Sequence, residues 1–347
     1  MKRIIIIFFV CILSFISTFS QSNQAMKELE ANIKPLVDLV FDAPTDNERF
    51  NANEKLLVNL EEVLSMSKSF SYSFDGLKRI SILKSPDNRF RIFTWAVIAQ
   101  DGTFENFGFV QALNENSGEY EVYKLTDRSE EIFNPNEAKC DNANWFGAVY
   151  YDLIQLKDQD RTYYTLLGYD GNSIYTKRKI IEPINFKGRS SQPEFGASVF
   201  FKERDRKRFV FEYNPETSFV LKWDNQYYEN KAKQKTNPIS ALFKRTTAPN
   251  IQADKNIPPD PSTVIFEQMI VYEKLEPMYE GMENMPQFFV GSGFVNGFKF
   301  ERGRWRFIEG VLPRNDNPKK GLEPKKKREG SEQPMYIPNK GFKKISK

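Results

Sequence analysis

Histidine is absent from all 347 residues of the chain. Ser-His-Asp and Cys-His nucleophile systems need an imidazole as their base, so neither can be assembled. Zinc sites with imidazole ligands are excluded in the same way. Loops that cradle phosphates are missing too, because no GxxxxGK[ST] or GxGxxG motif follows a strand pattern. We therefore predict that the protein carries no cofactor.

Cysteine is nearly absent, with Cys11 and Cys140 the two in the chain. Cys11 lies in a segment that we expect to be removed, which leaves Cys140 alone. One thiol cannot form an intramolecular disulfide, even in an oxidising compartment. We predict a buried thiol without a functional role at Cys140.

The first twenty residues have the pattern of a secretory signal peptide. Lys2 and Arg3 precede an apolar run over residues 4–16, and small residues then lie three and one positions before a cut preceding Gln21. The run is short for a membrane span, which needs about 20 residues. A retained N-terminal anchor is the alternative. We predict export to the periplasm, or to the outer-membrane or extracellular face, of a Gram-negative bacterium, with no membrane span once the signal is removed.

Charge is concentrated at the C-terminal end. Residues 314–347 hold 11 basic and 4 acidic residues, and Lys2 and Arg3 add two more positive charges. Since the net charge of the whole chain is +4, residues 21–313 have a net charge of −5. This acidic body does not predict a nucleic-acid partner. The basic run in the tail could contact an anionic lipid, a polyanion of the envelope or an acidic partner, although a solvated tail is the favoured interpretation. Its residues are Lys325, Lys326, Lys327 and Arg328.

Carboxylates are the catalytic groups that remain, and two of them beside aromatic platforms suffice for glycoside hydrolysis. The candidate glycan contacts are Trp145, Trp223, Asp152 and Asp170. A structural role is the favoured interpretation of each, because tryptophan in a strand is usually core and Asp170 fits a turn. Asp170-Gly171-Asn172 lacks the periodicity of a calcium-binding loop. Nothing in the spacing selects a pair of acids, so we assign no catalytic or metal-binding residue.

Two segments near the N-terminus have helical periodicity. Apolar residues fall on one stripe over residues 26–41 and again over 48–66. We expect Pro35 to kink the first helix or delay its start, and Asp46 to cap the second. The pair predicts a helical hairpin over residues 21–69 that packs on the rest of the fold.

From Phe70 onward the pattern changes to short runs that favour strands, arranged as hairpins. Asp170-Gly171-Asn172 separates two such runs and gives the clearest hairpin signal, because Gly, Asp and Asn tolerate positive φ. Three further hairpins are expected around Asp101-Gly102, Asn214-Pro215 and Arg302-Gly303. The predicted strands span 77–83, 90–99, 104–112, 120–125, 146–156, 163–168, 174–184, 197–201, 208–213, 219–223, 264–272, 288–290, 297–300 and 305–308.

These patterns predict a mainly β protein. No helical crossover separates the strands, so an antiparallel domain over residues 70–312 is expected. Its architecture is left open between a sandwich, a barrel and an irregular propeller. Residues 225–262, polar and rich in proline, are interpreted as a long insertion, and residues 313–347 as a disordered basic tail.

Several motifs in the second half resemble a group of uncharacterised secreted bacterial β-proteins. The resemblance covers residues 150–312. It is carried by Tyr150-Tyr151-Asp152, Tyr163, Gly168-Tyr169-Asp170-Gly171-Asn172, Phe195-Gly196, Arg208 to Tyr213, Gly297-Phe298-Lys299-Phe300, Gly303 and Trp305. It implies an envelope protein of a Gram-negative cell and assigns no functional residue.

Two functions are compatible with this sequence. The favoured hypothesis is a non-enzymatic, exported binding or scaffold protein of the envelope, with a protein or glycan partner. Export, the aromatic β body and the missing catalytic groups support it. The alternative is a carboxylate-dependent enzyme acting on glycans, or a glycan-binding module, which would use the aromatic and acidic residues of the strands.

Overall fold

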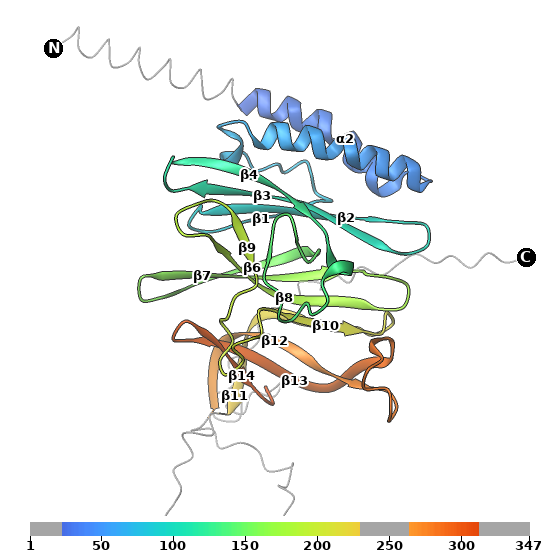
Figure 1. The fold of residues 1–347 in the computed structure, drawn as a ribbon, viewed down its shortest axis with the longest axis vertical. Coiled ribbons are helices and arrows are strands. Elements are labelled where there is room, and N and C mark those ends of the chain that lie inside the picture. Colours follow the sequence, from blue (N-terminus) through green and yellow to red (C-terminus); the bar gives the residue numbers. More distant parts are fainter. Residues whose placement is uncertain (1–22, 230–263, 312–347) are drawn as a thin grey trace, which may run out of the picture.

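The computed structural model describes residues 23–229 and 264–311, and Figure 1 shows that they form a layered molecule. Helical residues 23–42 and helix α2 (Asp46–Leu64) come first, and strands make up most of the remainder. The strands are β1 (Ser81–Lys84), β2 (Phe90–Ile98), β3 (Phe104–Asn114), β4 (Glu119–Thr126), β5 (Cys140–Asp141), β6 (Val149–Asp158), β7 (Arg161–Asp170), β8 (Lys177–Phe186), β9 (Pro193–Phe195), β10 (Phe209–Tyr213), β11 (Leu221–Glu229), β12 (Val264–Pro277), β13 (Phe289–Glu301) and β14 (Arg304–Ile308). The described residues also include the short 3-10 turns η1 (Ser69–Ser71), η2 (Ser129–Glu131) and η4 (Pro286–Phe288).

The strands form three antiparallel sheets, which stack in chain order. The first sheet has the order β1-β2-β3-β4, and the third has the order β11-β12-β13-β14. The second has the order β5-β9-β8-β7-β6, with β10 also paired to β8. Figure 1 shows the helices above the first sheet, the second sheet beneath it and the third sheet at the far end. The prediction of a mainly β fold with an N-terminal helical pair is confirmed, and its architecture is a stack of open sheets.

A separate hydrophobic core fills each space between neighbouring layers. One lies between the helices and the first sheet and includes Leu60 and Phe93. A second, around Trp145, lies between the first and second sheets, and a third, around Trp305, lies between the second and third. The first and second sheets are therefore covered on both faces, which explains why eight of the nine residues of β2 are buried. A buried hydrogen bond of 2.7 Å from Trp95 Nε1 to Asn53 Oδ1 fixes α2 on the first sheet.

The two helices differ from the expectation only at their ends. Thr45, not Asp46, caps α2. The Thr45 hydroxyl accepts a hydrogen bond from the backbone N–H of Glu48, and the Glu48 carboxylate accepts one from the backbone N–H of Thr45. Asp46 is instead the first helical residue, and its Oδ1 accepts from the Gln100 N–H at 2.9 Å. Helical structure continues through Pro35 without interruption.

The hairpin predictions hold where the chain reverses within one sheet. Gly102, with φ of 84°, joins β2 to β3, and Arg302 and Gly303, both with positive φ, join β13 to β14. The prediction around Asn214-Pro215 is wrong, because β10 pairs with β8 and β11 pairs with β12. That connection passes from the second sheet to the third. Turn residues mark a reversal, but they do not say whether the two flanking strands pair.

Several predicted segments have different boundaries in the structure, and the strand expected over residues 77–83 begins only at Ser81. Residues 197–201 form no strand, apart from a bridge between Phe200 and Trp305. Residues 289–290 and 297–300 belong to one strand, β13, whose pairing with β12 is interrupted by a register shift, whereas residue 288 ends η4. Residues 225–229 of the predicted insertion continue β11. The remainder of that insertion, the predicted signal peptide and the predicted basic tail lie outside the described residues.

Gly171 is needed for space rather than for positive φ. In the turn between β7 and β8 the positive φ belongs to Asn172, at 50°. A Cβ on Gly171 would lie 2.2 Å from a ring carbon of Phe104 on β3. The strongest hairpin signal in the sequence therefore also marks a close contact between the first and second sheets.

Replacing Gly171 with alanine should lower the free energy of unfolding by about 1–3 kcal/mol, the usual cost of overpacking. The reason is the forced displacement of the Phe104 ring. Urea unfolding of Gly171→Ala, Phe104→Ala and the double variant tests it as a thermodynamic cycle. Gly171→Ala should cost much less in the Phe104→Ala background, and an equal cost in both would contradict a steric cause.

Candidate functional site

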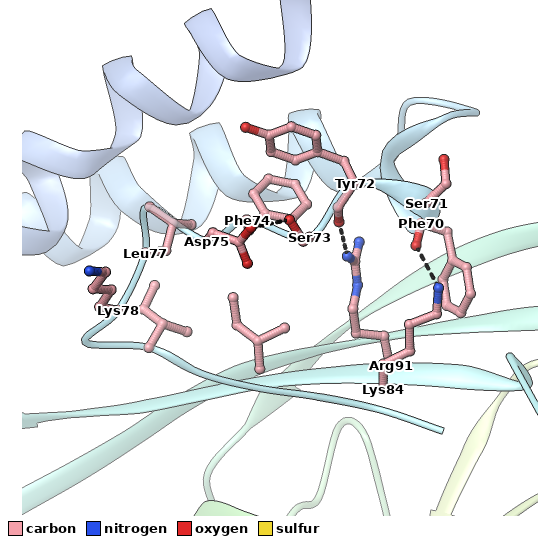
Figure 2. A pocket seen from close by; sticks show the side chains of 12 residues that line it. Phe70, Ser71, Tyr72, Ser73, Phe74, Asp75, Leu77, Lys78, Lys84 and Arg91 are labelled. Carbon is pink, nitrogen blue, oxygen red and sulfur yellow. Dashed lines mark hydrogen bonds between the residues drawn. The ribbon is translucent and has the colours of Figure 1, made fainter. Parts of the chain in front are cut away.

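A surface pocket of about 370 Å³ lies where the helical layer connects to the first sheet. Its outer wall is the segment of residues 70–80, which leads from η1 to β1, and its floor is formed by β1 and β2 (Figure 2). Glu30, in the first helix, holds this segment in place. Its carboxylate accepts from the Tyr72 hydroxyl at 2.5 Å and from the Gly76 N–H at 2.6 Å. Burial and Glu30 together raise the pKa of Tyr72 to about 12, so its hydroxyl stays protonated as the donor.

Arg91 projects from β2 at the back of this pocket and is only 2% exposed. Its Nη1 donates to the Tyr72 carbonyl at 2.5 Å, as Figure 2 shows, and its Nη2 donates to the Ser69 carbonyl at 3.0 Å. Nη2 also donates to Gln111 Oε1 at 2.7 Å. Gln111 in turn donates to the Leu64 carbonyl at the end of α2. The guanidinium therefore joins η1, the pocket segment and the first sheet.

All three acceptors of the Arg91 guanidinium are uncharged, and its Nε has no hydrogen-bond partner. Within the described residues it forms no ion pair with a carboxylate. The nearest compensation comes from aromatic faces, with Cζ 4.7 Å from the Phe93 ring centroid and 5.0 Å from that of Phe74. Burial lowers the pKa of Arg91 to about 9. This is a buried positive charge held by dipoles and rings alone.

A second cation lies directly opposite Arg91. Lys84 of β1 is paired in register with Arg91 of β2, so the two side chains share a face of the sheet. The Lys84 ammonium donates to the Phe70 carbonyl at 3.3 Å and lies 4.3 Å from the Phe70 ring centroid. Burial, and then the charge of Arg91, lower the pKa of Lys84. Like charges at paired positions repel, which favours an anion in the space between them.

The rim of the pocket carries one more residue of each sign. Lys78 and Asp75 both line it, and the Asp75 carboxylate accepts from the Ser73 hydroxyl at 2.8 Å. Three cationic residues and one acidic residue therefore line the pocket, so its charge is positive although that of the body is negative. Apolar side chains complete the lining: Phe74 and Leu77 come from the pocket segment, and Ile82 comes from the floor on β1.

The structure places the two predicted tryptophans in different cores. Trp145 is fully buried between the first and second sheets, where its Nε1 donates to the Tyr150 hydroxyl at 2.9 Å. Trp223 packs between the second and third sheets, perpendicular to Trp305 with ring centroids 5.8 Å apart. The two tryptophans therefore lie on opposite faces of the second sheet and do not share a site.

The two predicted acids take part in local contacts. Asp170 is 2% exposed, and its Oδ1 accepts from Asn106 Nδ2 of the first sheet at 3.2 Å and from the Asn172 N–H at 2.9 Å. Burial raises its pKa. Asp152 follows a register shift in β6 and accepts from the N–H of its neighbour Leu153, with a pKa raised by burial. Neither acid lines the pocket.

The other sequence predictions concern the basic run of the tail, metal binding and Cys140. Lys325, Lys326, Lys327 and Arg328 lie outside the described residues. No group of three or more acidic or cysteine side chains is placed to hold a metal ion within residues 23–229 and 264–311. Cys140 is a buried free thiol at 3% exposure, as predicted.

Sequence reasoning did not identify Arg91 or Lys84. One signal was present: the two residues flank residues 85–89, between two predicted strands, at positions that pair if those strands form a hairpin. Their shared face follows from that register. The burial of Arg91 does not, because it depends on residues 69–80 folding over the sheet.

The fold and the pocket together define a class: a helix-covered stack of antiparallel sheets with a cationic pocket at its side. Comparison of the chain with protein families, with curated proteins and with solved structures gave no match in any of the three. Among the described residues, no helix is long and apolar enough to cross a bilayer.

Proposed function

We propose that this chain is a non-enzymatic binding protein, exported to the cell envelope, whose cationic pocket takes an acidic group of a protein or glycan partner. The observation that carries the proposal is the buried guanidinium of Arg91, which has no anionic partner within the described residues.

Burying a charge without a counter-charge costs several kcal/mol, even after the surroundings relax. Carbonyl acceptors and aromatic faces offset part of that cost at Arg91. An anion that enters the pocket offsets more of it, because two charges attract more strongly away from bulk water. The pocket is therefore arranged in advance for a negative group, which reduces the entropic cost of binding.

Export and the envelope location rest on the signal-like residues 2–20 and on the resemblance carried by residues 150–312. The basic run Lys325–Arg328 adds a possible contact with an anionic surface. The acids of the enzymatic alternative, Asp152 and Asp170, are engaged in local hydrogen bonds, whereas the pocket presents cations. The binding function is for this reason the one that the geometry favours.

The test uses the mature chain, residues 21–347, immobilised and exposed to envelope proteins and polysaccharides. A partner should be retained at low salt and recovered chemically unchanged. Its binding should be weaker to the Lys84→Gln variant. Lys124→Gln, which removes the same charge from an exposed position on β4 of the same sheet, should have no effect. Equal retention by both variants would contradict the pocket. Turnover of a bound glycan, lost on a single Asp or Glu substitution, would favour the enzyme instead.

A further inference from the structure

The size of the pocket restricts the ligand. A volume of about 370 Å³ accommodates roughly a dozen non-hydrogen atoms, at about 30 Å³ for each water-sized unit. A free phosphate or sulfate ion, with about five such atoms, would leave most of the pocket to water. The anionic group is therefore part of a somewhat larger molecule.

The free donors at the charged wall restrict the anionic group. Both Nη2 hydrogens of Arg91 are used, on Ser69 and Gln111, and one Nη1 hydrogen is used on Tyr72. The Lys84 ammonium donates one of its three hydrogens to the Phe70 carbonyl. The remaining hydrogens suit the two oxygens of a carboxylate better than the three of a phosphate monoester. Asp75 on the rim also disfavours a second negative charge.

The apolar wall restricts the body of the ligand. Phe74, Leu77, Ile80 and Ile82 contribute carbon atoms to the lining, and Figure 2 shows Phe74 beside Arg91 and Leu77 farther along the same segment. Burying an apolar group there gains about 25 cal/mol for each Å² removed from water. A body covered with hydroxyl groups would lose hydrogen bonds to water without replacing them on this wall.

We infer that the pocket binds a carboxylate carried on a compact apolar body of about ten non-hydrogen atoms. This inference rests on the proposed function and specifies its ligand class. The carboxylate lies between Arg91 and Lys84, and the apolar body lies against Phe74, Leu77 and Ile82. Either a free aliphatic acid or the C-terminus of a peptide with an apolar last residue supplies this chemistry.

Isothermal titration of the mature chain with defined probes tests the inference. Octanoate and N-acetylleucine should bind, and the tighter of the two identifies the source as a free acid or a peptide C-terminus. Octanol, octylamine and glucuronate should bind at least about tenfold more weakly, a difference of about 1.4 kcal/mol. Binding of octanol or octylamine equal to that of octanoate would overturn the need for a carboxylate. Tighter binding of glucuronate or inorganic phosphate would overturn the apolar body.

Three variants separate the two walls without relying on Arg91, whose loss could unfold the segment around it. Lys84→Gln should weaken octanoate about threefold to tenfold, as for loss of a partly exposed charged hydrogen bond. Ile82→Ala should weaken octanoate but not acetate, and Lys124→Gln should change neither. Equal affinities in all three would overturn the site.

The outcomes also separate this inference from the proposed function. If an envelope partner is lost with Lys84→Gln but neither octanoate nor N-acetylleucine binds, the inferred ligand class is wrong and the binding function still holds. If these probes bind at the pocket but no envelope partner is retained, the proposed binding function is wrong and the ligand class still holds.

Discussion

Replacement of Arg208 by methionine is expected to lower the free energy of unfolding by about 3–5 kcal/mol, the usual cost of breaking a buried ion pair from one side. Arg208 and Glu182 are both fully buried, with Nε and Oε2 2.7 Å apart. Arg208 also donates to the carbonyls of Pro135, Ala138 and Phe195, which fixes the loop before β5 against β9. Without the guanidinium, the Glu182 carboxylate remains buried and three carbonyls lose their donor.

Urea unfolding of Arg208→Met measures this loss, and two comparisons identify its cause. The double variant Glu182→Leu/Arg208→Met should be clearly more stable than Arg208→Met alone, because it leaves no uncompensated charge. Arg128→Met breaks a pair with Glu131 whose side chains are 48% and 65% exposed, and should cost less than about 1 kcal/mol. A loss of that small size for Arg208→Met would show that the buried pair contributes little.

Local patterns predicted the elements well because each depends on near neighbours in the sequence. The helical stripe over 26–41 and the strands over 90–99 and 104–112 match helical residues 23–42, β2 and β3 closely. The assignment of strands to sheets was not predictable in this way. β10 and β11 have the spacing of a hairpin, yet they pair with β8 and β12, because they pack on opposite sides of one shared core, β10 in the second sheet and β11 in the third.

The candidate site illustrates the same limit. In β2, alternation places Arg91 on the same face as Phe93 and Trp95, so the sequence gives this face no polar character apart from Arg91 itself. Both faces of the strand are covered, one by the helical layer and the other by the second sheet, so Arg91 becomes the buried back of a pocket. Glu182 of β8 in the second sheet is buried in the same way, and it pairs with Arg208, the residue just before β10. Sequence alternation assumes one wet face, and a stack of sheets removes it.

Raising the pH above about 10 is expected to unfold the protein in one cooperative step. Burial raises the pKa of Tyr150, Tyr164, Tyr213 and Tyr272, all 9% exposed or less. Below pH 10 these hydroxyls are protonated in both the folded and the unfolded chain, so stability is complete. Above it the unfolded chain loses protons that the folded one keeps, and each tyrosine costs about 1.4 kcal/mol per pH unit. Four of them cost about 5 kcal/mol by pH 11, close to the whole stability of many domains.

Arg91 acts in the opposite direction, because its pKa of about 9 in the folded chain lies below its value in the unfolded chain. Stability gained from this one group as pH rises above 9 is outweighed by the loss from four tyrosines. Urea midpoints between pH 8 and pH 11.5, with tyrosinate absorbance followed in parallel, test the balance. Tyr272→Phe should move the alkaline midpoint upward, whereas Tyr175→Phe, at a residue 70% exposed, should not. Gradual tyrosinate formation with an unchanged urea midpoint would show instead that these hydroxyls reach solvent without unfolding.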